Sequence, residues 1–147
     1  MARLTGPGGA DPTQLLRAAG AEFRSTGAGD VPEAWLAEVL PAGERDPRAV
    51  VVVDPPTPGA EHVDMGAWHV NARDEVHLVR SGEGVLQVVT PGGIVTVVLE
   101  PGDVMMVRGA EHRYRPASPQ EWVLRWSGPP GAELEPRETG RAADPWP

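Results

Sequence analysis

Apolar and polar residues alternate in short runs over most of the chain, beginning near residue 48. Alternation with a period of two is typical of strands that bury one face. The segments between the runs, such as SGEG, PGG and EPGD, are rich in residues that form tight turns. Strands are predicted over 49–53, 62–70, 75–80, 85–90, 94–99, 104–107, 111–115 and 121–126. Short strands at this spacing predict a mainly β fold, either a sandwich or a barrel.

Helical patterns occur only before the strands. Asp11 and Pro12 are typical of an N-cap and a first helical position, so a short helix is expected over 13–19. A second helix is predicted between Asp30 and Pro41, where apolar residues fall on one helical face. The sequence therefore predicts two short N-terminal helices ahead of the strands.

The length of 147 residues is that of a single domain. We expect an N-terminal helical lead-in over 1–47 that packs on the barrel, the barrel itself over 48–127, and a C-terminal tail over 128–147. The first ten residues and the tail are rich in Gly, Pro and charged residues, so both are expected to fray or to lie over the surface.

The composition narrows the chemistry that the chain can perform. It has no Cys and no Lys, which excludes zinc–thiolate sites, Cys nucleophiles and Schiff-base lysines. The net charge of −8 argues against a nucleic-acid partner, because phosphates need a basic surface. The first residues have no apolar core, so no signal peptide is expected, and no apolar run approaches the roughly 20 residues that span a membrane. We therefore expect a cytoplasmic protein that binds neither nucleic acid nor membranes.

The histidines are clustered in the sequence. All four fall within a window of 51 residues, at His62, His69, His77 and His112. His62 follows a Pro-rich loop and is expected at the surface.

Side chains two residues apart on a strand point to the same face. His69 and Asn71 therefore share a face, and Glu75 and His77 share a face on the following strand. Because the turn between these strands is short, they are expected to be antiparallel neighbours. That arrangement would bring the four side chains together at one end of a barrel.

His112 lies on a later strand, with Tyr114 on the same face. Two imidazoles and one carboxylate, from His69, His112 and Glu75, make the ligand set of a non-haem Fe(II) site. Three protein ligands on an octahedral ion leave two positions for a bidentate substrate and one for dioxygen. The net charge of such a centre is near +1, which favours an anionic, chelating substrate.

The segment HVNARDEVHLVRSG over 69–82 resembles the first motif of the cupin family, H-x-H-x3-E-x6-G, and Gly102-Asp103 followed by His112 resembles the second. The segment WHVNARDEVH is similar to the E-H-T-H-x-x-D-E-V-R of acireductone dioxygenases. Segments 15–28, 121–126 and 131–147 also resemble parts of that family. The resemblance implies a cupin jelly-roll barrel, or double-stranded β-helix, with metal ligands at His69, Glu75 and His112.

The chain also departs from acireductone dioxygenases at named positions. Asn71 stands where the family has its second histidine, which leaves the His, Glu, His triad of cupins like 3-hydroxyanthranilate dioxygenase. An amide oxygen is a poor ligand beside imidazole, so Asn71 is expected on the substrate side. His77 replaces an arginine of the family. Arg125 matches a late-strand arginine and is expected either to bind a substrate oxyanion or to form a structural salt bridge.

His77 and Tyr114 are the candidate catalytic residues. His77 faces the same cavity as Glu75, where it would act as a general base on an enol or phenol, replace the missing histidine as a ligand, or simply pack. Tyr114 would donate a hydrogen bond to substrate or to bound oxygen, or fill the barrel.

Three functions are consistent with these residues. The first is an Fe(II)-dependent dioxygenase acting on a small enediol, enol or aminophenol-like anion, with a small-molecule substrate and dioxygen as partners. The second is an oxygen-independent metal enzyme, a cyclase, isomerase or lyase, and the third is a non-catalytic cupin that binds a small ligand. We expect one divalent transition metal, Fe(II), with Ni, Mn and Zn as alternatives. The exposed barrel edges would permit a homodimer.

Overall fold

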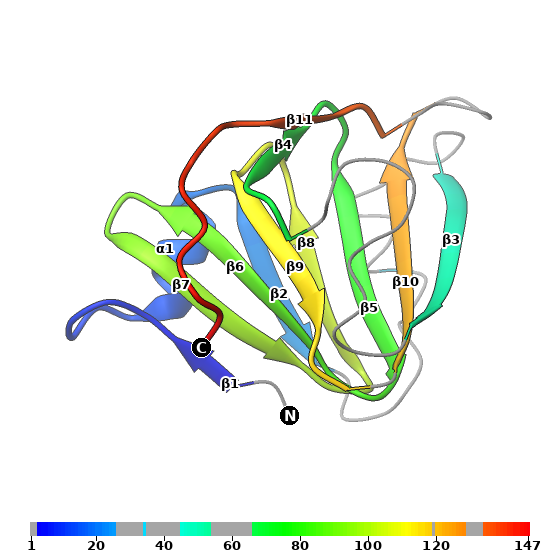
Figure 1. The fold of residues 1–147 in the computed structure, drawn as a ribbon, viewed down its shortest axis with the longest axis horizontal. Coiled ribbons are helices and arrows are strands. Elements are labelled where there is room, and N and C mark those ends of the chain that lie inside the picture. Colours follow the sequence, from blue (N-terminus) through cyan, green and yellow to red (C-terminus); the bar gives the residue numbers. More distant parts are fainter. Residues whose placement is uncertain (1–2, 26–33, 35–44, 54–65, 119, 129–133) are drawn as a thin grey trace.

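The chain was analysed as a computed structural model, which describes residues 3–25, 34, 45–53, 66–118, 120–128 and 134–147. These residues form two antiparallel sheets that face each other, with a short helix at one side (Figure 1). In chain order the elements are β1 (Arg3–Thr5), α1 (Pro12–Ala18), β2 (Ala21–Ser25), β3 (Arg45–Val53), β4 (His69–Asn71), β5 (Glu75–Ser81), β6 (Gly84–Thr90), β7 (Gly93–Leu99), β8 (Asp103–Val107), β9 (His112–Pro116), β10 (Gln120–Ser127) and β11 (Pro136–Glu138).

Six strands form the first sheet and five form the second. The first sheet has the order β1-β7-β6-β9-β4-β11, and the second has the order β2-β8-β5-β10-β3. Strands close in sequence are therefore often in different sheets, as β4 and β5 are. This crossing from one sheet to the other places the predicted site residues opposite one another.

The main hydrophobic core lies between the two sheets. Alternate residues of β7 are buried, which is the pattern that the sequence predicts for a strand with one face in the core. Both sheets contribute to this core, the first with Leu86 and Val97 and the second with Val79 and Leu124. A second, smaller cluster occupies the other face of the second sheet and consists of Val76, Leu78, Val104, Met106 and Val123.

The strand predictions from residue 75 to residue 126 are confirmed to within one residue at each end. The strand predicted over 62–70 is shorter in the structure, where β4 begins at His69. The first helix is also confirmed. Asp11 caps α1 by accepting the Thr13 N–H at 3.0 Å, and Leu16 is fully buried. The second predicted helix lies outside the described residues apart from Ala34.

Both ends of the chain add strands that the sequence did not predict. β1 pairs with β7, β2 pairs with β8, and β11 pairs with β4. β1 and β11 lie in the segments expected to fray or to lie over the surface, and neither is frayed, because each pairs at an edge of the first sheet. β2 lies in the N-terminal lead-in, which is therefore not purely helical. β1 and β11 have three residues each, which is too few alternations to be recognised in a sequence.

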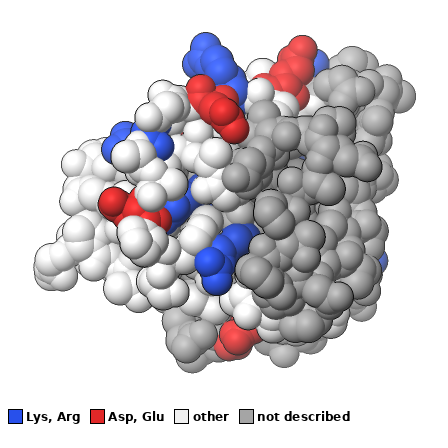
Figure 2. Space-filling view, viewed as in Figure 1, with Lys and Arg blue, Asp and Glu red and all other residues white. Residues whose placement is uncertain are grey.

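The predicted barrel is not closed. No pairing between described strands joins the two sheets, so the fold is a jelly roll of two facing sheets. On the face shown in Figure 2, acidic and basic side chains are interspersed, and the acidic excess of the composition is not gathered into one patch there. Among the described residues, no helix has the length and apolar character that a membrane crossing requires.

Candidate metal centre

Four of the predicted site residues meet inside the protein, between the two sheets. His69 on β4 and His112 on β9 are paired across the first sheet, and their ring centroids lie 4.4 Å apart. Glu75 and His77 come from β5 in the second sheet. All four side chains are fully buried. The predicted convergence of these side chains is confirmed. The expectation that β4 and β5 are antiparallel neighbours is wrong, because the three residues between them carry the chain across to the other sheet.

The Glu75 carboxylate is at the centre of this group. Its Oε1 atom lies 2.5 Å from His112 Nε2 and 2.8 Å from His77 Nε2. Its Oε2 atom accepts a hydrogen bond from Asn71 Nδ2 at 2.5 Å. Since a carboxylate can only accept, this contact also fixes which end of the Asn71 amide faces Glu75.

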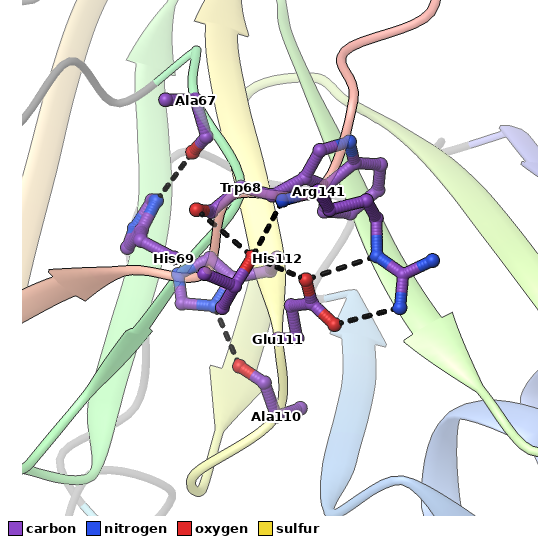
Figure 3. A network of polar contacts seen from close by, with 8 residues as sticks. Ala67, Trp68, His69, Ala110, Glu111, His112 and Arg141 are labelled. Carbon is purple, nitrogen blue, oxygen red and sulfur yellow. Dashed lines mark hydrogen bonds and ion pairs between the residues drawn. The ribbon is translucent and has the colours of Figure 1, made fainter.

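His69 and His112 are held in the same way. The Nδ1 atom of His69 donates to the Ala67 carbonyl at 2.7 Å, and that of His112 donates to the Ala110 carbonyl at 2.8 Å (Figure 3). When these rings are neutral, Nε2 carries a lone pair. The Nε2 atom of His69 is buried without a hydrogen-bond partner, whereas that of His112 lies 2.5 Å from Glu75 Oε1. A lone pair that faces a carboxylate oxygen at 2.5 Å requires a cation between them, either a proton or a metal ion. Imidazoles whose Nδ1 is bound to a backbone carbonyl are typical metal ligands.

His77 is held differently. Trp122 Nε1 donates to its Nδ1 atom at 3.3 Å, so the proton of the neutral ring is on Nε2, which donates to Glu75 Oε1. The Trp122 and His77 rings are also stacked, at 5.6 Å between centroids. Both nitrogens of His77 therefore have partners, which leaves no lone pair for a general base or for a metal ligand.

Two sets of three residues could hold a metal ion. The donor atoms of Glu75, His77 and His112 lie within 4.8 Å of one another, so proximity selects His77 as the third member. The hydrogen bonds select His69 instead, because its Nε2 is the buried atom without a partner. We give more weight to the hydrogen bonds, since a ligand must offer a free lone pair.

The electrostatics of the site agree with a buried carboxylate that keeps its charge. Burial alone would raise the pKa of Glu75, but the charges of His112 and His77 outweigh burial and hold it well below its usual range. Burial opposes the charged form of His112, yet Glu75 raises its pKa. Burial, with repulsion from His112, lowers the pKa of His69 to about 4, so that ring is neutral at physiological pH. A neutral imidazole is the form that binds metal.

The structure places the remaining predicted site residues as follows. Asn71 is buried beside Glu75, and its Oδ1 atom has no hydrogen-bond partner. Tyr114 shares the inner face, but its hydroxyl donates to Gln120 Oε1 at 2.7 Å and lies where a side chain on Gly84 would overlap it. Gly84 is four residues along β6 from the partner of His112, so the hydroxyl is directed away from the site. This geometry does not support the predicted bond from Tyr114 to substrate or oxygen, and burial raises the pKa of the phenol.

The expectation that Arg125 reaches substrate is corrected. Leu124 pairs with His77 and Trp126 pairs with Glu75, so these residues share the inner face of β10 with the site. Arg125 pairs with Val76, which belongs to the cluster on the outer face. Side chains alternate along a strand, and Arg125 therefore lies on the opposite side of the second sheet from the metal centre. The prediction for His62 concerns a residue outside the described part of the chain.

The contact of Trp122 with His77 was not predictable from the sequence. The alternation of 121–126 places Trp122 on the inner face, but only the pairing of β10 with β5 brings its indole against His77. Thr139 and Arg141 were not predicted either, and they contact the residues next to His69 and His112.

Two facing antiparallel sheets with a buried His, Glu, His group between them are the arrangement expected of a cupin jelly roll. Among solved structures, the chain is similar to acireductone dioxygenase from Bacillus anthracis, which was determined with a cadmium ion in its active centre. The TM-score is 0.56 and the identity is 19%, over 78% of this chain and 82% of that chain. No family model and no curated protein matches the sequence. The similarity confirms the predicted cupin fold and the resemblance to a divergent acireductone dioxygenase, and at this identity it bears on the fold alone.

The hydrogen bonds predict different tautomers for two of the histidines. In the metal-free protein at neutral pH, His69 should carry its proton on Nδ1 and His77 on Nε2. Long-range proton–nitrogen NMR spectra distinguish these forms, and the His77→Gln variant assigns the signals. A proton on Nδ1 of His77 would contradict the bond from Trp122.

Proposed function

We propose that this protein is a metal-dependent cupin enzyme whose metal ligands are His69, Glu75 and His112. The observation that carries the proposal is the pair of buried imidazoles, each held through Nδ1 to a backbone carbonyl, with Nε2 of His69 unpartnered and Nε2 of His112 against the Glu75 carboxylate. Burying polar atoms without partners is costly, so their retention beside a carboxylate supports a bound cation.

The donor set fits a divalent transition metal. Two imidazoles and one carboxylate form the facial set of non-haem Fe(II) oxygenases, and Ni, Mn and Zn also accept these ligands. When bound, the metal ion would supply Lewis acidity and a common point of attachment for substrate and dioxygen.

The residues around Glu75 determine what this chain contributes to the reaction. Asn71 and His77 each donate a hydrogen bond to the carboxylate, which keeps it oriented and charged. One carboxylate against a divalent ion leaves a net charge near +1, which favours an anionic substrate with two oxygen or nitrogen donors. The free Oδ1 of Asn71 is an acceptor for a substrate hydroxyl or amine, which supports the substrate-binding role expected for this residue.

Among the three functions, these contacts favour the dioxygenase acting on a small enediol, enol or aminophenol-like anion. The oxygen-independent alternatives depended on His77 as the residue that moves a proton, and both its nitrogens have partners. A non-catalytic binding cupin has no need for two buried imidazoles that are held through Nδ1 beside a carboxylate. A substrate that chelates as an anion can lose its proton to solvent before it binds, so no free base is required.

The ligand assignment is tested by metal content. Purified wild-type protein, incubated with Fe(II) under nitrogen and desalted, should retain about one ion per chain. His77→Gln keeps a donor toward Glu75 and should also retain the ion, whereas His69→Ala and His112→Ala should lose it. Loss of metal from His77→Gln with retention in His69→Ala would assign His77 as the ligand in place of His69.

The reaction class is tested separately by oxygen uptake. The Fe(II)-loaded protein should consume dioxygen with at least one member of a panel of small enediols and aminophenol carboxylates, and His112→Ala should not. Turnover of the same compound at an unchanged rate without oxygen would exclude a dioxygenase and leave the metal centre intact.

A further inference from the structure

The spacing of His69 and His112 depends on a weak part of the first sheet. β4 has only three residues, and its pairing with β9 consists of the single pair His69 and His112. By contrast, β6 and β9 pair over five positions. A single pair of residues is too small a contact to keep two metal ligands at a constant distance. Other contacts must therefore hold β4 against β9.

The C-terminal segment supplies these contacts, first as β11 at the edge of the first sheet and then as the tail that follows it. β11 pairs with all three residues of β4, and the tail then continues along the sheet (Figure 1). The Thr139 N–H donates to the Trp68 carbonyl at 3.0 Å. The Thr139 hydroxyl lies 2.6 Å from Glu111 Oε2 and donates to it. Trp68 immediately precedes His69, and Glu111 immediately precedes His112, so Thr139 connects the two ligand strands.

Arg141 reinforces this connection. Its Nε and terminal nitrogen donate to the two oxygens of Glu111 at 2.9 and 3.0 Å, and its guanidinium lies 5.9 Å from the Trp68 ring (Figure 3). A single exposed ion pair contributes little to the stability of the fold, but bidentate geometry fixes the orientation of both partners. The hydrogen bond from Arg141 lowers the pKa of Glu111, which indicates that the carboxylate is charged at neutral pH.

The end of the tail makes a third attachment. Arg113, the residue after His112, is stacked between the Trp68 and Trp146 rings at 4.9 and 4.0 Å. It also donates to the Asp144 carbonyl at 2.9 Å. The residues on both sides of His112 and the residue before His69 are therefore all in contact with one segment near the C-terminus.

We propose that Thr139 and Arg141, through Glu111 and Trp68, are positioning residues that set the separation of the two histidine ligands. We call these four residues the C-terminal clamp. None of them touches the metal, and they act through the backbone on the residues that do. The proposal rests on the ligand assignment given under the proposed function.

Removing the clamp should weaken metal binding more than it weakens the fold, because the main core lies between the sheets and does not include these residues. Loss of contacts that orient ligands typically reduces metal affinity roughly 10–100-fold. The variant Arg141→Ala removes both bonds to Glu111. Arg137→Ala is the matched control, because it removes the same charge from an exposed position of β11 in the same segment.

The experiment measures the affinity of the full-length chain for Co(II) by competition with a chelator, together with the unfolding midpoint of the metal-free protein. We expect an affinity loss in that range for Arg141→Ala and for Glu111→Gln, no loss for Arg137→Ala, and similar unfolding midpoints. The double variant should lose no more than either single variant, because both remove the same contact. Wild-type affinity in Arg141→Ala, or an affinity loss matched by Arg137→Ala, would overturn the clamp while leaving the metal centre in place.

A wild-type protein that binds no Co(II) would instead contradict the proposed function. The clamp is then judged by amide hydrogen exchange in β4 and β9 of the metal-free protein. Faster exchange in these strands in Arg141→Ala than in Arg137→Ala supports the clamp, and equal exchange in the two variants overturns it.

Discussion

A carboxylate without access to water keeps its charge only if polar or positive groups replace the water. Glu75 is such a carboxylate, fully buried between the two sheets. Its partners Asn71, His77 and His112 come from β4, β5 and β9, so this one side chain determines how three strands from both sheets meet. Leaving a buried charge without one of its partners costs on the order of 3–5 kcal/mol. The hydrogen bonds of Glu75 therefore determine both the geometry of the site and the packing of this end of the jelly roll.

The histidines divide into two kinds around this charge. His69 and His112 each use Nδ1 on the carbonyl two residues earlier, and the tail holds the neighbouring residues from outside the sheet. His77 is fixed from within the core by Trp122 and supports Glu75. Asn71 occupies the position where the resembled family has another histidine, and it holds the carboxylate instead of offering an imidazole. The chain thus surrounds the proposed three-ligand centre with residues that orient its side chains.

Alternation of apolar residues is a local property of the sequence. It therefore predicted the strands from 75 to 126, and it also predicted that the His77 side chain points to the inner face. Which sheet a strand joins depends on distant partners, so the separation of β4 from β5 could not be read from their short turn. The bond from Trp122 to His77 joins residues 45 positions apart and has no local pattern. The outward direction of Arg125 was predictable in principle, because alternation along the strand places it on the opposite face from Trp122 and Trp126. The family resemblance instead pointed to the inner face.

In the proposed centre two imidazoles, His69 and His112, bind the metal ion together with Glu75. X-ray absorption at the metal edge counts bound imidazoles directly through their scattering. For the Fe(II)-loaded protein the account predicts two imidazoles in the wild type, two in His77→Gln and one at most in His69→Ala. Three imidazoles in the wild type, or a decrease from two to one in His77→Gln, would contradict it.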